Sequence, residues 1–172
     1  VAEHFGLEQE VDLVMGTFSK SLATVGGYIA GPIEVIDYVR HNARSGIFSA
    51  AMPPAAAAAA MKAIEIIQAE PERRKQLWET TDYMKRELEG LGYDTGPSES
   101  PVIPLAIGDD LTAFNMAKRL QEEGVFVNPV VSPAVPPGHS MIRTSYMATH
   151  KREHLDAALS AIKKVGRELD VI

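Results

Sequence analysis

The chain has 172 residues, with 17 Lys and Arg against 23 Asp and Glu, a formal net charge of −6 and no cysteine. This acidic balance argues against a general nucleic-acid binder, which needs a basic face, and the lack of cysteine excludes disulfides, cysteine-bound zinc and a thiol nucleophile. No run of about 18 apolar residues is present to cross a membrane, and no secretory signal is visible. The composition predicts a globular protein with no nucleic-acid partner, and the cytoplasm is its expected compartment.

Residues 1–60 are predicted to form short strands and one helix. Apolar, β-branched runs predict strands at residues 11–15, 26–31 and 47–49. The first strand should be buried and should end at Gly16, and Pro32 can occupy the first turn of the helix that follows the second strand. The chain opens at Val1 without a methionine and soon reaches a strand-like segment, so we expect it to be the later part of a longer protein.

From Ala55 onward the composition favours helices. Six alanines at residues 55–60 lead into Met61 and three isoleucines, a run with high helix propensity, and Pro71 predicts a break. A second helix should follow and end near Gly90. Its buried face is predicted by five side chains at spacings of 4, 3, 4 and 3, which are Leu77, Thr81, Met84, Leu88 and Leu91.

The rest of the chain predicts a strand–helix–strand–loop–strand–helix order. Strands are expected at residues 102–107, 125–127 and 141–147, a helix at 111–123 and a stiff, proline-rich loop at 131–138. The last helix should pack through one apolar face, which consists of Leu155, Leu159, Ile162, Val165 and Leu169. This order predicts a small α+β unit after the first zone.

The segment Gly16–Leu22 carries the clearest chemistry. Lys20 lies between two serines, with apolar sequence on either side. A lysine that forms imines must be partly desolvated or lie near another cation, and hydroxyls two or three residues away could bind a phosphate. On spacing alone, a solvated surface lysine is the commoner cause of such a pattern, so both interpretations stay open at this point.

The chain resembles a known enzyme family along nearly its whole length. Residues 12–31, DLVMGTFSKSLATVGGYIAG, look like the lysine segment of the α-oxoamine synthases, and residues 45–54 and 142–150 continue the likeness. Members of this family are fold-type-I, pyridoxal-phosphate enzymes of the class I/II aminotransferase fold, which join an amino acid to an acyl-CoA with loss of CO₂. Residues 124–136 are most similar to the bacterial serine palmitoyltransferases within it.

The resemblance implies roles for five residues. Lys20 would be the catalytic residue and would bind pyridoxal 5'-phosphate covalently as an imine. Thr17 and Ser19 would hold the cofactor phosphate, and Ser49 would reach the phosphate bound in the neighbouring subunit. Arg143 would bind the substrate carboxylate, for which a bidentate guanidinium is well suited. Without the family, an ion pair between this arginine and a nearby Asp or Glu would be the better interpretation.

The resemblance also implies an α/β fold in two parts. Residues 1–60 would be the C-terminal portion of the large cofactor-binding domain, and residues 61–172 the connecting helix and the small C-terminal domain of a cytoplasmic homodimer. The implied reaction joins L-serine and palmitoyl-CoA to give 3-ketosphinganine, a step of sphingolipid biosynthesis. The alternatives are a glycine C-acetyltransferase or 8-amino-7-oxononanoate synthase type of activity, and a non-catalytic partner subunit.

The chain also departs from the family pattern. The family's stacking histidine and ring-nitrogen aspartate lie before the matching segment, so we expect the 172-residue chain to be inactive alone. Residues 130–142 lack the second arginine that some serine palmitoyltransferases carry. His150 and His154 have a spacing that could suit a metal, but we expect a helix start there and no metal site. Gly26 and Gly27 are expected to serve packing or close backbone approach.

Overall fold

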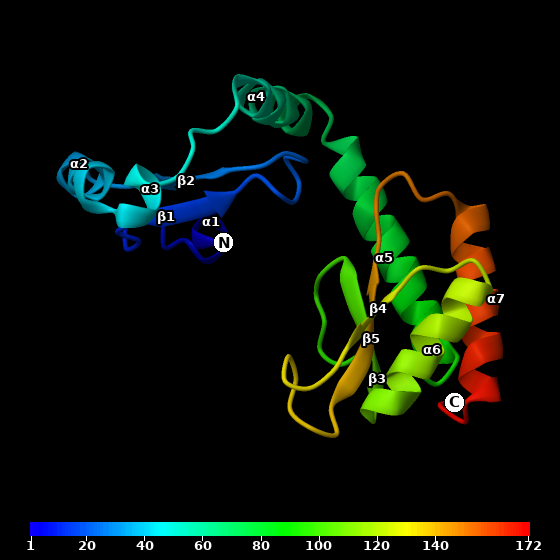
Figure 1. Cartoon of the computed structure of the whole chain (residues 1–172). Helices are drawn as coiled ribbons and strands as arrows, with labels where there is room; N and C mark the ends of the chain where they lie inside the picture. Colours follow the sequence, from blue (N-terminus) through cyan, green and yellow to red (C-terminus); the bar gives the residue numbers. More distant parts are fainter. The chain divides into compact units, whose positions relative to one another are not determined.

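The computed structural model describes all 172 residues, which form two compact units, Val1–Glu70 and Pro71–Ile172 (Figure 1). The first unit is built on a two-stranded antiparallel sheet of β1 (Val14–Thr17) and β2 (Gly27–Ala30). Four helices belong to the same unit, namely α1 (Ala2–Phe5), α2 (Ile33–Asn42), α3 (Arg44–Ile47) and α4 (Pro54–Ala69). None of the helices in the chain combines the length and the hydropathy that a membrane span requires.

Two strand predictions for the first unit are wrong. The first strand begins at Val14, three residues later than expected, and the side chain of Val14 is 44% exposed rather than buried, because no second layer covers the sheet within this unit. Residues 47–49 form no strand. The amide of Phe48 donates to the carbonyl oxygen of Arg44 at 2.9 Å, so a local helical hydrogen bond satisfies the backbone that a strand would have used.

The helical predictions around Pro71 are confirmed. Helix α4 ends at Ala69, and α5 (Glu72–Gly90) begins directly after Pro71, whose ring cannot donate a backbone hydrogen bond. The chain leaves α5 through Gly92, which has a φ of 101° that favours glycine. Three of the five side chains on the expected face of α5 are fully buried, namely Thr81, Met84 and Leu88.

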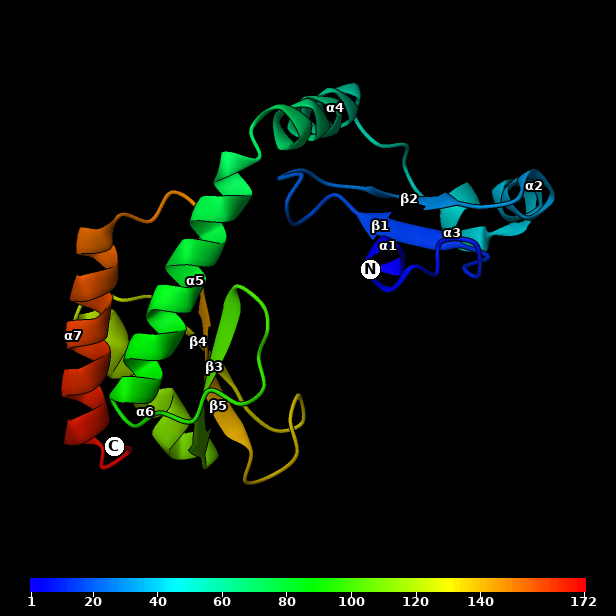
Figure 2. The ribbon, with the colours of Figure 1, turned by 180° about the vertical axis from the view of Figure 1, so that it is seen from behind.

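The second unit is a three-stranded antiparallel sheet with helices on one face. The strand order is β3 (Val102–Gly108), β5 (Ser140–Ser145) and β4 (Asn128–Val130). Figures 1 and 2 show α5, α6 (Asp110–Glu122) and α7 (Arg152–Glu168) along the same side of this sheet. The prediction of a strand at residues 125–127 is wrong, because the amide of Val125 closes the end of α6 by donating to the carbonyl of Leu120 at 2.8 Å.

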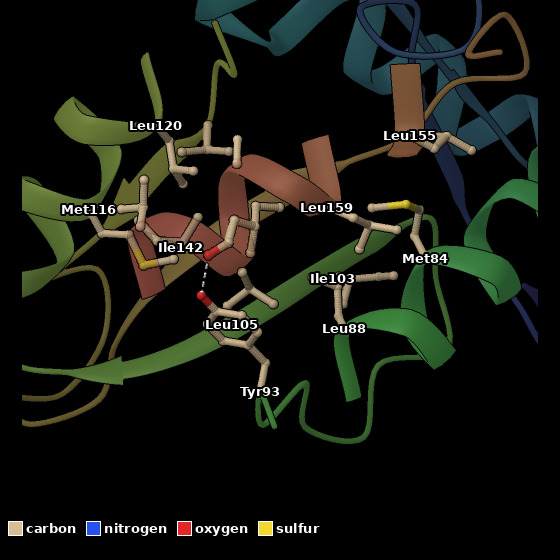
Figure 3. Close-up of a cluster of buried hydrophobic side chains, with 14 residues drawn as sticks. Met84, Leu88, Tyr93, Ile103, Leu105, Met116, Leu120, Ile142, Leu155 and Leu159 are labelled. Carbon is tan, nitrogen blue, oxygen red and sulfur yellow. Dashed lines mark hydrogen bonds between the residues drawn. The ribbon is translucent and has the colours of Figure 1, made fainter. Parts of the chain in front are cut away.

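The core of the second unit lies between the sheet and its helices (Figure 3). Alternate residues of the strands point into it, among them Ile103 and Ile142, and both are fully buried. The Tyr93 hydroxyl donates to the carbonyl oxygen of Ile162 in α7 at 2.9 Å. Because the tyrosine is buried, this bond satisfies a polar group that would otherwise destabilise the core.

A buried glycine makes room for this tyrosine and gives a testable prediction. A Cβ atom at Gly166 would lie 2.0 Å from the Tyr93 hydroxyl oxygen. Gly166→Ala should therefore overpack the core and lower the free energy of unfolding by about 1–3 kcal/mol, measured by urea denaturation of the full chain. Gly90→Ala is the matched control, since a Cβ there meets nothing within 4 Å. An unchanged unfolding free energy in Gly166→Ala would contradict this packing.

A salt bridge between α7 and the end of α6 and a hydrogen bond between α5 and α7 predict how stability depends on pH. Lys164 donates to the carboxylate of Glu123 at 2.8 Å, which lowers the pKa of Glu123, and the Tyr83 hydroxyl donates to Asp156 at 2.6 Å, which lowers the pKa of Asp156. A carboxylate with a lowered folded-state pKa stabilises the fold when ionised, and that stabilisation is lost as the pH falls through the folded-state pKa.

We therefore expect the free energy of unfolding to decrease as the pH falls below the usual glutamate value of 4.5. Glu123→Gln should flatten this decrease, because the variant has no proton to take up at that position. Glu99→Gln, which removes an exposed carboxylate elsewhere in the second unit, is the control. A pH profile that Glu123→Gln leaves unchanged would show that this ion pair makes no contribution.

Candidate active site

Lys20 lies in the loop that joins β1 to β2, and backbone hydrogen bonds close this loop at its base. The amide of Phe18 donates to the carbonyl of Gly26 at 2.9 Å, and the amide of Thr24 donates to the carbonyl of Phe18 at 3.1 Å. Within the loop, the amide of Ala23 donates to the carbonyl of Lys20 at 3.0 Å. The backbone of Lys20 is thus held in a tight turn, while its side chain is exposed.

Two hydroxyls stand next to this lysine. The Oγ1 atom of Thr17 and the Oγ atom of Ser19 lie 2.8 Å apart, and the amide of Ser19 donates to Thr17 Oγ1 at 3.3 Å. Both side chains are exposed, so their hydroxyls can donate to an anion outside the chain. A single ligand that carries both a phosphate and an electrophilic carbon could therefore bind the hydroxyl pair through the first group and Lys20 through the second.

Gly26 at the end of the loop and Gly27 at the start of β2 are needed for close packing, as expected from the sequence. A Cβ atom at Gly26 would lie 2.5 Å from the sulfur of Met52, and a Cβ atom at Gly27 would lie 2.6 Å from the carbonyl oxygen of Gly16. Met52 follows Ser49 by three residues, so the segment that carries Ser49 packs against the lysine loop. The Ser49 hydroxyl donates to the carbonyl of Ser45 within its own turn.

Arg143 lies on the central strand of the second unit. It pairs with Pro104 on one side and with Asn128 on the other. Its neighbours Ile142 and Thr144 point into the core, so Arg143 points to the face of the sheet that carries no helix. The side chain is exposed and forms no ion pair within the chain, which leaves both edges of the guanidinium available for a carboxylate.

A cavity that was not predicted from the sequence lies beside Arg143. It has a volume of about 780 Å³ and is bordered by the segment between α6 and β4, the end of β5 and the start of α7. The Tyr146 hydroxyl is buried without a hydrogen-bond partner, and burial raises the pKa of Tyr146 to about 12. His150 accepts the amide of Met147 on Nδ1 at 3.2 Å, and burial lowers the pKa of His150. A cavity formed by three separate segments has no short motif that would reveal it in the sequence.

Comparisons with known proteins find clear relatives. Residues 1–162 match the family of class I and II aminotransferases. A serine palmitoyltransferase of Sphingobacterium spiritivorum is 51% identical over 170 residues, which are 99% of this chain and 43% of that protein. An 8-amino-7-oxononanoate synthase of Symbiobacterium thermophilum is 48% identical over 169 residues, which are 98% of this chain and 43% of that protein.

The fold is similar to that of solved structures. A serine palmitoyltransferase variant from S. paucimobilis, with a bound PLP–myriocin aldimine, matches with a TM-score of 0.92 at 32% sequence identity. This match covers 99% of the present chain and 44% of the other. The chain thus spans less than half the length of the relatives that it matches.

Proposed function

The chain belongs to the class I and II aminotransferase family, and from this premise we propose that the whole protein is a pyridoxal-phosphate-dependent acyltransferase. It would condense an amino acid with an acyl-CoA with loss of CO₂, and L-serine with palmitoyl-CoA is the pair that we propose. The observation that carries this proposal is the loop in which Lys20 follows the paired hydroxyls of Thr17 and Ser19. The 51% identity to a serine palmitoyltransferase supports the choice of substrates.

The residues of the lysine loop suit pyridoxal phosphate. This cofactor carries an aldehyde, which a lysine amine can bind, and a phosphate, which hydroxyl donors can bind. When bound, it supplies an electron sink that stabilises negative charge at the Cα atom of an amino acid. The two hydroxyls lie three residues and one residue before Lys20 in the sequence and are exposed, so this donor set fits both groups of the cofactor.

Each residue then has a distinct task. Lys20 would hold the cofactor through its Nζ atom, and its amine, when free, could take up the Cα proton of the amino acid. Thr17 and Ser19 fix the phosphate end. Arg143 binds the substrate carboxylate through two parallel hydrogen bonds, which orients the amino acid for the bond changes at Cα. Ser49 would donate to the phosphate of the neighbouring subunit, for which its hydroxyl must turn away from the carbonyl of Ser45.

The whole protein is accordingly proposed to be a cytoplasmic homodimer that acts in sphingolipid biosynthesis. In it, residues 1–60 would complete the large cofactor-binding domain, and residues 61–172 would form the connecting helix and the small domain. The 48% identity to an 8-amino-7-oxononanoate synthase supports a second candidate function.

The two candidate functions are distinguished by the products of the full-length enzyme. The enzyme is supplied with serine, alanine or glycine and with acyl-CoAs of defined length. A 3-keto amino alcohol from serine supports the first, and turnover only with the other amino acids supports the second.

The role of Lys20 is tested by Lys20→Ala in the full-length enzyme. Turnover should fall by at least roughly 10²- to 10⁴-fold, the scale of a single acid–base group, and the visible absorption of lysine-bound cofactor should vanish. Lys62→Ala is the matched control, because Lys62 is exposed in the same unit and pairs with Glu65 in its own helix. Turnover that survives in Lys20→Ala would overturn the assignment.

The role of Arg143 is tested by steady-state kinetics. Arg143→Ala should raise KM for the amino acid roughly 10- to 100-fold, because charge-assisted hydrogen bonds are lost, and should leave KM for the acyl-CoA nearly unchanged. Arg143→Lys keeps the charge but not the bidentate geometry. Its KM for the amino acid should therefore lie between that of the wild type and that of Arg143→Ala. Equal increases in both KM values would remove Arg143 from the carboxylate site.

A further inference from the structure

We propose that Tyr28, whose ring lies over Gly16, and Phe18, whose ring stacks on Tyr28, form an aromatic clamp that positions the Lys20 loop for attachment of the cofactor. The inference rests on the proposed function of Lys20 and goes beyond it. It names three positioning residues, and none of them needs to touch the cofactor. The geometry that supports it lies entirely within the first unit.

The first part of the clamp is a cross-strand pair. Gly16 and Tyr28 lie directly opposite each other in the antiparallel pairing of β1 and β2. A Cβ atom at Gly16 would lie 2.3 Å from Cε1 of the Tyr28 ring and 2.9 Å from its hydroxyl oxygen. The Tyr28 ring therefore lies across the Cα atom of Gly16. It occupies the space that the side chain of any larger residue at position 16 would fill. An aromatic ring over a glycine in the facing strand helps to fix the register of a hairpin.

The second part of the clamp is the ring of Phe18, the first residue after β1. Its centroid lies 6.0 Å from that of Tyr28, with 29° between the ring planes. The backbone of Phe18 is held as well, because its amide donates to Gly26 and its carbonyl accepts from Thr24. Both the side chain and the backbone of Phe18 are thus fixed at a point two residues before Lys20.

The ring contact adds a side-chain restraint to the backbone hydrogen bonds that close the loop at its base. Within residues 1–172 no residue between Thr17 and Gly26 is fully buried, so here the ring pair and the backbone hydrogen bonds order this segment. Phe18 lies between Thr17 and Ser19. The orientation of its backbone therefore sets where both hydroxyls and the side chain of Lys20 point. If the rings part, the backbone bonds at the base of the loop remain, but the direction of the chain toward Lys20 is less restricted.

The test uses the full-length protein titrated with pyridoxal phosphate. The readouts are the apparent dissociation constant from the visible absorption and the fraction of Lys20 modified after borohydride reduction, measured by mass spectrometry. Tyr28→Ala should weaken attachment roughly 2- to 10-fold, the range that corresponds to the loss of an aromatic pair. Phe18→Leu should have a similar effect. Tyr28→Phe keeps the ring and should match the wild type, and so should Tyr38→Ala, which removes an exposed tyrosine of α2.

A double-mutant cycle isolates the clamp from general loss of stability. Gly16→Ala should weaken attachment because its new methyl group displaces the Tyr28 ring, and it should have no further effect in the Tyr28→Ala background. If the double variant weakened attachment by the product of the two single effects, the clamp would be overturned. A single variant with a lower melting temperature and unchanged attachment at Lys20 would overturn it as well. Attachment that is normal in the wild type and in every variant overturns the clamp alone. If wild-type Lys20 is not modified, the proposed function fails as well.

Discussion

The position of Lys20 depends on the antiparallel pairing of β1 and β2, which closes the loop between them. This pairing places Tyr28 opposite Gly16 and brings the carbonyl of Gly26 to the amide of Phe18 at 2.9 Å. A shift of one residue would send each side chain of the hairpin to the other face. The turn that holds Lys20 and the neighbouring hydroxyls both follow from this register. The chemistry proposed for the loop therefore depends on the backbone geometry of the hairpin.

The second unit is stabilised differently. Its helices and sheet bury a continuous apolar core, in which Tyr93 bonds to α7 and Gly166 leaves room for it. This packing uses one face of the sheet and leaves Arg143 on the other. A rigid central strand is a suitable place for a residue that must present a guanidinium at a fixed angle. The core thus fixes the strand that carries Arg143, although the Arg143 side chain lies outside the core.

The helices could be predicted from the sequence better than the strands. The faces of α5 and α7 repeat over several turns, which gives a strong periodic signal, and Pro71 marked the junction correctly. Short apolar runs such as residues 47–49 and 125–127 carry too little pattern to separate a strand from a helical turn or a loop. The burial expected for residues 11–15 failed because burial depends on what packs against a strand, which periodicity does not describe.

The candidate site came from the resemblance more than from spacing, since a lysine between two serines is common on protein surfaces. The α/β aminotransferase fold that the resemblance implied is confirmed. The pairing of Tyr28 with Gly16 and the cavity beside Arg143 were not predicted, because each joins residues that are distant in the sequence. The glycine and the aromatic residue were visible individually, but only the strand register shows that they meet.

Attachment of pyridoxal phosphate to Lys20 is tested most directly by the visible absorption spectrum of the full-length protein with this cofactor, before and after addition of serine or glycine. We predict an absorption band from cofactor bound to Lys20 that shifts with serine and not with glycine. A shift with glycine alone would move the assignment to the alternative acyltransferases. The absence of any band would contradict the account, because the fold would then be present without the chemistry proposed for its lysine.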